Sequence, residues 1–131
     1  MSNRNHYEIK CVGVITLTTR NLSGVEHHIL MCNGATCMRN GGEDVTQAIR
    51  DEIARQGAAD RVHTTRTRCN GRCDDACVTI VYPEGHWFRH TTPESGREMV
   101  KAYLEGYIPS HPCLTHHFSG DRFIRVAPPF D

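Results

Sequence analysis

Four of the seven cysteines stand in two close pairs, a pattern typical of metal ligands. Four residues separate Cys32 from Cys37, three separate Cys69 from Cys73, and 31 residues lie between the pairs. Four thiolates that converge on one point can hold zinc or an iron–sulfur cluster. Zinc sites prefer pairs with two intervening residues, whereas these wider gaps suit two irons with one pair each. The residues alone favour a cluster over zinc and leave a third alternative, a cysteine-rich composition without a metal.

The other cysteines and the nine histidines give weaker signals. Cys77 begins an apolar strand and Cys11 lies within one, so both are expected to behave as small hydrophobic residues. For Cys77 the alternative is a reserve ligand or a redox-reactive thiol. Cys113 is expected to be a tail thiol without a function. A Rieske centre would need cysteine–histidine pairs on two loops, and a pair of that spacing occurs at Cys113 and His116 alone. We therefore assign no histidine to a metal.

Composition excludes several classes of protein. The chain has 131 residues, of which 38% are hydrophobic and 23% charged, as in an ordinary globular domain. Lys and Arg together number 15, as do Asp and Glu, so nothing predicts bulk binding to nucleic acid or membranes. No apolar run reaches the ~18 residues of a membrane helix, and residues 1–10 lack a secretory segment. These features predict a soluble protein of the cytoplasm. The cytoplasm is reducing, and cysteines there more often bind metals than form disulfides.

The hydrophobic pattern predicts the elements that position the cysteines. Strands are expected over residues 9–20, 25–32, 61–67 and 77–83, with one more in 84–90. Helices are expected over 43–56, where apolar residues recur at three and four positions, and over 91–107. Thr92 and Pro93 suit the N-cap and first position of the second helix. The resulting order predicts an α/β fold, with a mixed sheet covered by helices.

Each cysteine pair follows a predicted strand. If those strands are neighbours, both loops lie at the same end of the sheet. No glycine-rich loop stands where it could hold a dinucleotide, and no C-x-x-C dithiol of the thioredoxin type is present. The chain is therefore not predicted to oxidise a nicotinamide itself.

The motifs together resemble those of the thioredoxin-like [2Fe-2S] ferredoxins. They also resemble the cluster domain of the 24-kDa subunit of respiratory NADH dehydrogenase. The resemblance covers about residues 26–108: the paired cysteines, Tyr82-Pro83-Glu84-Gly85, Trp87, and the helix opened by Thr92-Pro93-Glu94. The spacing of Cys32 and Cys37 is that of the NADH dehydrogenase subunit, whereas "VYPEGHWF" resembles the stand-alone carriers. Where the family usually has Gly-Pro after the fourth ligand and before the next strand, this chain has Ala76-Cys77.

The resemblance implies a fold, a cofactor and a role. The fold would be thioredoxin-like, with two helices flanking the sheet. Residues 1–131 would form one domain with its core at about 26–108, an extra strand within the extension 1–25, and an irregular tail over 109–131. The ligands of a single [2Fe-2S] cluster would be Cys32, Cys37, Cys69 and Cys73.

The implied role is that of a soluble one-electron carrier, not an enzyme, and frequently a homodimer. The alternative is an accessory or regulatory iron–sulfur protein, or a structural zinc protein, that binds a partner without carrying electrons. Reduction potentials of clusters depend on the charges and hydrogen bonds around them, so the residues alone predict neither the potential nor the partner.

The ligand loops predict the kind of surface that a redox partner would meet. They carry more basic than acidic residues: Arg39, Arg66, Arg68 and Arg72 against Asp74 and Asp75. The surface around the cluster is therefore expected to be net positive and to select a partner protein with an acidic patch.

Overall fold

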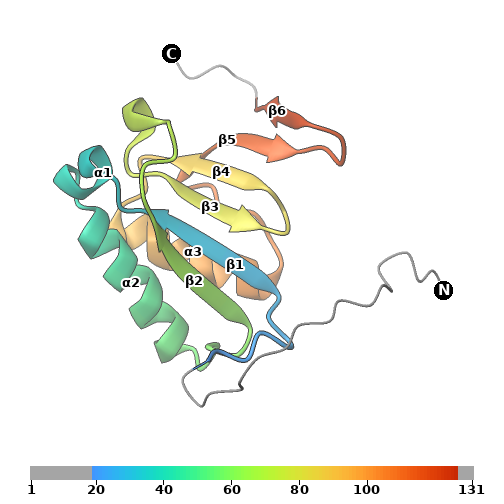
Figure 1. Cartoon of the computed structure of the whole chain (residues 1–131). Coiled ribbons are helices and arrows are strands. Elements are labelled where there is room, and N and C mark those ends of the chain that lie inside the picture. The colour runs from blue at the N-terminus through green and yellow to red at the C-terminus, as the bar shows by residue number, and fades with distance from the viewer. Residues whose placement is uncertain (1–18, 127–131) are drawn as a thin grey trace, which may run out of the picture.

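The computed structural model describes residues 19–126, in which six strands form one mixed sheet. The strand order is β2-β1-β3-β4-β5-β6 (Figure 1). Neighbouring strands pair antiparallel except β1 and β2, which run parallel. The strands are β1 (His27–Cys32), β2 (Val62–Thr67), β3 (Thr79–Tyr82), β4 (His86–Arg89), β5 (Cys113–Phe118) and β6 (Phe123–Arg125). The mixed sheet and its helices confirm the predicted α/β class.

Two long helices, α2 (Gly42–Arg55) and α3 (Pro93–Glu105), pack against each other, and α3 lies behind the sheet in Figure 1. Gly96 permits this close approach, because a Cβ atom there would lie 3.0 Å from Cγ1 of Ile49. None of the helices within residues 19–126 is long and apolar enough to cross a membrane.

The core forms between the two long helices and the sheet. Ile49 of α2 and Met99 of α3 are fully buried, as are Ile29 of β1, Val81 of β3 and Phe88 of β4. Strand residues alternate as the sheet geometry requires, so Ile29 and Met31 are buried against the core while His28 and Leu30 are half-buried. The apolar stripe predicted for the first helix is the face that α2 buries.

The N-terminus of α3 is closed by a capping box, which confirms the expected role of Thr92. Its hydroxyl accepts from the backbone N–H of Ser95 at 3.1 Å, and the Ser95 hydroxyl accepts from the N–H of Thr92 at 2.8 Å. Both bonds satisfy backbone donors that a helix start leaves without partners.

Replacing Thr92 with Ala should therefore destabilise the protein by about 1 kcal/mol, the usual cost of losing an N-cap side chain. Urea denaturation followed by circular dichroism would measure this change. Thr92→Ser keeps the acceptor and should stay close to wild type. Equal stability of the Ala and Ser variants would contradict a capping role.

One expectation for the fold is wrong, and another falls almost wholly outside the described residues. The tail over 109–131 is not irregular, because β5 and β6 within it extend the sheet beyond β4. Thr115 is buried in β5 and donates from its hydroxyl to the carbonyl of Trp87 at 3.0 Å. The strand predicted over 9–20 falls almost wholly outside the described residues, and Thr19 and Arg20 belong to no strand.

The loop after β1 also holds a helix that the pattern did not predict, α1 (Ala35–Arg39). Its N-cap is Gly34, which has no side chain to cap the helix, and it spans five residues. A 3₁₀ turn over Cys73–Asp75 follows β2 in the second cysteine loop.

Candidate metal centre

The two cysteine loops lie at the same end of the sheet because β1 and β2 are parallel neighbours. Cys32, the last residue of β1, stands opposite Thr67, the last residue of β2. The backbone N–H of Asn33 continues the pairing by donating to the carbonyl of Thr67 at 2.8 Å. The structure thus confirms the expectation that adjacent strands bring the loops together.

Cys32 and Cys37 form the inner half of the site. Cys32 ends β1, Cys37 lies within α1, and their exposed fractions are 5% and 3%. The backbone N–H of Cys32 donates to the carbonyl of Val78 at 3.1 Å, which fixes this cysteine to the residue directly before β3. Both thiols are therefore held by regular structure and shielded from water.

Cys69 and Cys73 form the outer half and are exposed. Their sulfur atoms lie 3.6 Å apart, and the backbone N–H of Gly71 donates to Sγ of Cys69 at 3.3 Å. Nε of Arg72 donates to the carboxylate of Asp75 at 2.7 Å, which braces the turn on which Cys73 lies. The site therefore has a buried half and a solvent-facing half.

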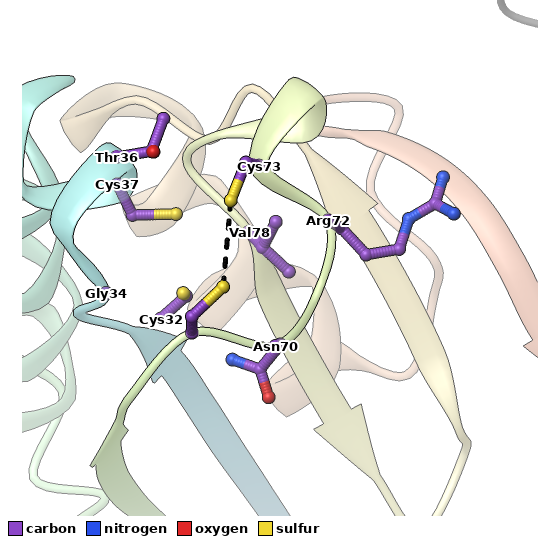
Figure 2. Close-up of a pocket in the computed structure, with 9 residues that line it drawn as sticks. Cys32, Gly34, Thr36, Cys37, Asn70, Arg72, Cys73 and Val78 are labelled. Carbon is purple, nitrogen blue, oxygen red and sulfur yellow. Dashed lines mark hydrogen bonds between the residues drawn. The ribbon is translucent and has the colours of Figure 1, made fainter.

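All four cysteines line one small pocket, with about 190 Å³ free of protein atoms. In Figure 2 the sulfur atoms of Cys37 and Cys73 point into the same space, and the dashed line joins the sulfurs of Cys69 and Cys73. Gly34, Thr36, Asn70, Arg72 and Val78 complete the lining. Within residues 19–126, no three His, Cys, Asp or Glu side chains converge closely enough for a single metal ion.

Gly34 sets how closely the two loops approach. Its φ and ψ of −65° and 167° are open to any residue, so the glycine is required for space and not for its conformation. A Cβ atom at this position would lie 2.8 Å from Cα and 2.9 Å from the backbone N of Cys69. The pocket thus depends on a contact between the backbones of two segments that are distant in sequence.

The two buried thiols differ in acidity. Burial raises the pKa of Cys37 to about 12. Burial also acts to raise the pKa of Cys32, but hydrogen bonds from the backbone of Gly34, from Cys37 and from Asn70 outweigh it and leave the pKa below its usual value. Iron binds the thiolate form, so loading of a metal would remove the proton that Cys37 retains.

Sequence reasoning missed Gly34 and Asn70. The Asn70 side chain donates to the Thr67 hydroxyl at 2.7 Å and to the Arg68 carbonyl at 3.1 Å, which ties the loop back to the end of β2. An asparagine one residue after a cysteine is an ordinary loop residue, so its position alone carried no signal. Gly34, directly before a cysteine-bearing segment, could have been suspected as a point of close approach.

The remaining described cysteines lie outside this pocket. Cys77 is buried, as expected for a small hydrophobic residue, and Cys113 is half-buried at the start of β5. Cys11 lies outside the described residues.

Comparison with known proteins places the chain in a family. Residues 17–104 match the family model of thioredoxin-like [2Fe-2S] ferredoxins. A ferredoxin-type protein of Priestia megaterium is 44% identical over 110 residues, which cover 84% of this chain and 86% of the relative. A [2Fe-2S] ferredoxin of Clostridium pasteurianum is 26% identical over 90 residues, or 61% of this chain and 86% of the relative.

A solved structure agrees with these sequence relatives. The thioredoxin-like [2Fe-2S] ferredoxin of Aquifex aeolicus superimposes with a TM-score of 0.61 at 25% identity, and covers 69% of this chain and 96% of its own. The family match, the shared fold and the pocket with four cysteines agree on the type of cofactor, a [2Fe-2S] cluster. The chain belongs to the thioredoxin-like [2Fe-2S] ferredoxin family.

Proposed function

We propose that this protein is a one-electron carrier whose [2Fe-2S] cluster is held by Cys32, Cys37, Cys69 and Cys73. The observation that supports it most is that two loops, 31 residues apart in sequence, bring four thiols to one pocket. When bound, the cluster accepts and releases single electrons. The protein holds it between one buried and one exposed pair of thiols, so one side of the cluster would lie near a docked partner.

The donor set fits a binuclear cluster better than zinc. A structural zinc ion requires its ligands around a single centre, with sulfur about 2.3 Å from the metal. Two thiol pairs, carried by separate loops around one pocket, match a cofactor with two metals, and the family match supports the same choice. We also propose that the protein works in a reducing compartment such as the cytoplasm, where cysteines more often bind metals than form disulfides.

Metal analysis and redox titration test this proposal. Protein prepared without oxygen should be reddish-brown, contain two irons and two acid-labile sulfides per chain, and undergo reversible reduction. Rapid exchange of electrons with a ferredoxin reductase would support the proposed role as an electron carrier. A cluster that is destroyed on reduction would instead favour an accessory or regulatory iron–sulfur protein, and zinc without iron would refute both.

The docking surface that we propose has two free arginines and not four. Arg66 is paired with Glu43, and Arg72 with Asp75, so their charges are largely neutralised. Arg39 contacts only the Thr36 hydroxyl, and the Arg68 side chain has no partner among residues 19–126. These two exposed guanidinium groups flank the site and would attract an acidic patch on a redox partner.

Reversing both charges should weaken docking. In Arg39→Glu/Arg68→Glu, the bimolecular electron-transfer rate with an acidic reductase at low salt should fall by about tenfold. The rate of the wild-type protein should decrease with added salt, and the variant should lose most of that slope. Stopped-flow absorbance over a range of ionic strength would measure both.

Arg122→Glu is the matched control, because Arg122 is exposed in the β5–β6 turn. The pairing of β4 with β5 places this turn at the end of the sheet opposite the cysteine loops. The electron-transfer rate of the Arg122→Glu variant and its dependence on salt should match those of the wild type. A double variant with an unchanged slope would mean that the partner docks elsewhere.

We also propose that the protein forms a homodimer, as the family resemblance implies. Its described surface carries several exposed large apolar residues that association could cover, among them Tyr107, Ile108, Phe118, Phe123 and Ile124. Sedimentation velocity at micromolar concentration distinguishes a dimer of twice 14.8 kDa from a monomer.

A further inference from the structure

We propose that Cys77 is a positioning residue for the metal centre. Its buried thiol holds the short helix that carries Cys37 against the segment directly before β3. This inference rests on the proposed function, because it takes Cys37 as a cluster ligand. It assigns a role to the one buried cysteine in the described chain that does not line the pocket.

The contacts of the Cys77 side chain are directed at the end of α1. Its sulfur lies 3.4 Å from the carbonyl oxygen of Cys37 and 3.3 Å from that of Asn40. These carbonyls belong to the last turn and the C-cap of α1. The Cys37 carbonyl already accepts from the backbone N–H of Asn40 at 3.0 Å, so the thiol is its second donor, whereas the Asn40 carbonyl follows the helix and is left without a donor from the helix itself. With 3% of its surface exposed, Cys77 makes these contacts out of reach of water. The thiol therefore contacts both carbonyls at the end of α1 and joins this end of the helix to the segment before β3.

Helix α1 depends on such contacts for its position. Its five residues are far too few for independent stability, and Gly34 provides no side-chain cap at its start. On the other side Gly42 packs directly on it, since a Cβ atom there would lie 2.9 Å from the Cys37 carbonyl oxygen. The Cys37 carbonyl is thus fixed between the first residue of α2 and the thiol of Cys77.

Residues 77 and 78 anchor both of the buried cysteines. The carbonyl of Val78 accepts from the backbone N–H of Cys32 at 3.1 Å, and the thiol of Cys77 contacts the backbone carbonyl of Cys37. Cys77 is itself held, because its carbonyl accepts from the N–H of Thr91 at 3.0 Å. The two residues directly before β3 therefore hold both cysteines of the inner half of the site in place.

A cysteine suits this position because it is small, uncharged and able to donate. A residue that orients a metal ligand influences how long the metal is retained and, through the geometry of the ligand, its reduction potential. Alanine would remove the donor and leave a small void, valine would fill the space without a donor, and serine would keep a donor in a smaller side chain.

Three substitutions of the full-length, cluster-loaded protein test this role. Cys77→Ala and Cys77→Val should both lose visible absorbance about fivefold faster than the wild type in the presence of a chelator, the factor that one net hydrogen bond supplies. Both should also shift the midpoint potential in the same direction. Cys77→Ser should stay within about twofold of the wild-type rate and restore the wild-type potential. Cys113→Ala, the same loss of a thiol outside the pocket, is the control and should change neither quantity.

The outcomes separate the role of Cys77 from the proposed ligand set. If Cys77→Val behaves as the wild type, the side chain merely fills space, and the proposal is wrong. If Cys77→Ser loses iron as Cys37→Ser does, Cys77 is itself a ligand, and the proposal is equally wrong. Absence of iron from the wild-type protein, or its full retention in Cys37→Ser, would instead refute the proposed function. Circular dichroism of each variant without the cluster checks that α1 and the sheet still form.

Discussion

Replacing either buried cysteine, Cys32 or Cys37, with serine should reduce the bound iron from two atoms per chain to nearly none. A serine oxygen is a poorer ligand for iron than a thiolate. Because these positions are 5% and 3% exposed, water cannot enter to complete the coordination. Iron and sulfide analysis, with the visible spectrum of protein loaded without oxygen, would measure the loss.

The exposed pair should respond less severely. Cys69 and Cys73 are exposed, so in Cys69→Ser and Cys73→Ser both solvent and the serine oxygen can reach the metal. We expect these variants to have partial cluster occupancy, a shifted visible spectrum and faster loss of the cluster. Cys113→Ser should retain full occupancy, since Cys113 lies outside the pocket. Full iron in a Cys32 or Cys37 variant, or a strong loss in the Cys113 variant, would overturn the proposed ligand set.

Gly34→Ala should abolish cluster binding as effectively as the loss of a ligand, although it changes no sulfur. The added Cβ would lie 2.8 Å from Cα of Cys69, and backbone atoms cannot give way as the end of a flexible side chain can. The two loops must therefore separate, at a cost of about 1–3 kcal/mol, the usual range for overpacking. Iron content and urea denaturation of the apoprotein would report the two effects separately.

Gly57→Ala provides the control for this substitution. Gly57 has a φ of +63°, and no atom lies within 4 Å of the position that a Cβ would take, so alanine there adds about 1–2 kcal/mol of backbone strain without a clash. This variant should lose stability and keep its iron, whereas Gly34→Ala should lose its iron. Normal iron content in Gly34→Ala would show that the loops can part without harm to the site.

Hydrophobic periodicity predicts those helices and strands of this fold in which buried residues recur at regular intervals. The helix expected over 43–56 is Gly42–Arg55, and the strand expected over 61–67 is Val62–Thr67. Strand β5 escaped prediction because its sequence, CLTHHF, carries two adjacent histidines and follows a proline-rich stretch. Pairing with β4 stabilises it, and such long-range pairing leaves no mark on the local pattern.

The four cysteines of the pocket were predictable for a different reason. Cysteine spacing and the position of each pair after a strand are local properties of the sequence, and they led directly to the pocket. The electrostatics around the pocket are not local. Arg66 loses its expected free charge to Glu43, 23 residues away, through a contact that exists only in the folded chain.

The hairpin of β5 and β6 changes which strand has an open edge. Without it, β4 would end the sheet with a row of unpaired backbone N–H and C=O groups, a template on which another chain can add a strand. In this protein β5 occupies that edge, and the outermost strand on this side among residues 19–126 is β6, which has three residues. Short edge strands are one of the ways in which natural proteins avoid uncontrolled sheet extension and aggregation. A homodimer of this chain could therefore not form by strand addition at β4, and would have to use a sheet face, the helices or one of the outer edges.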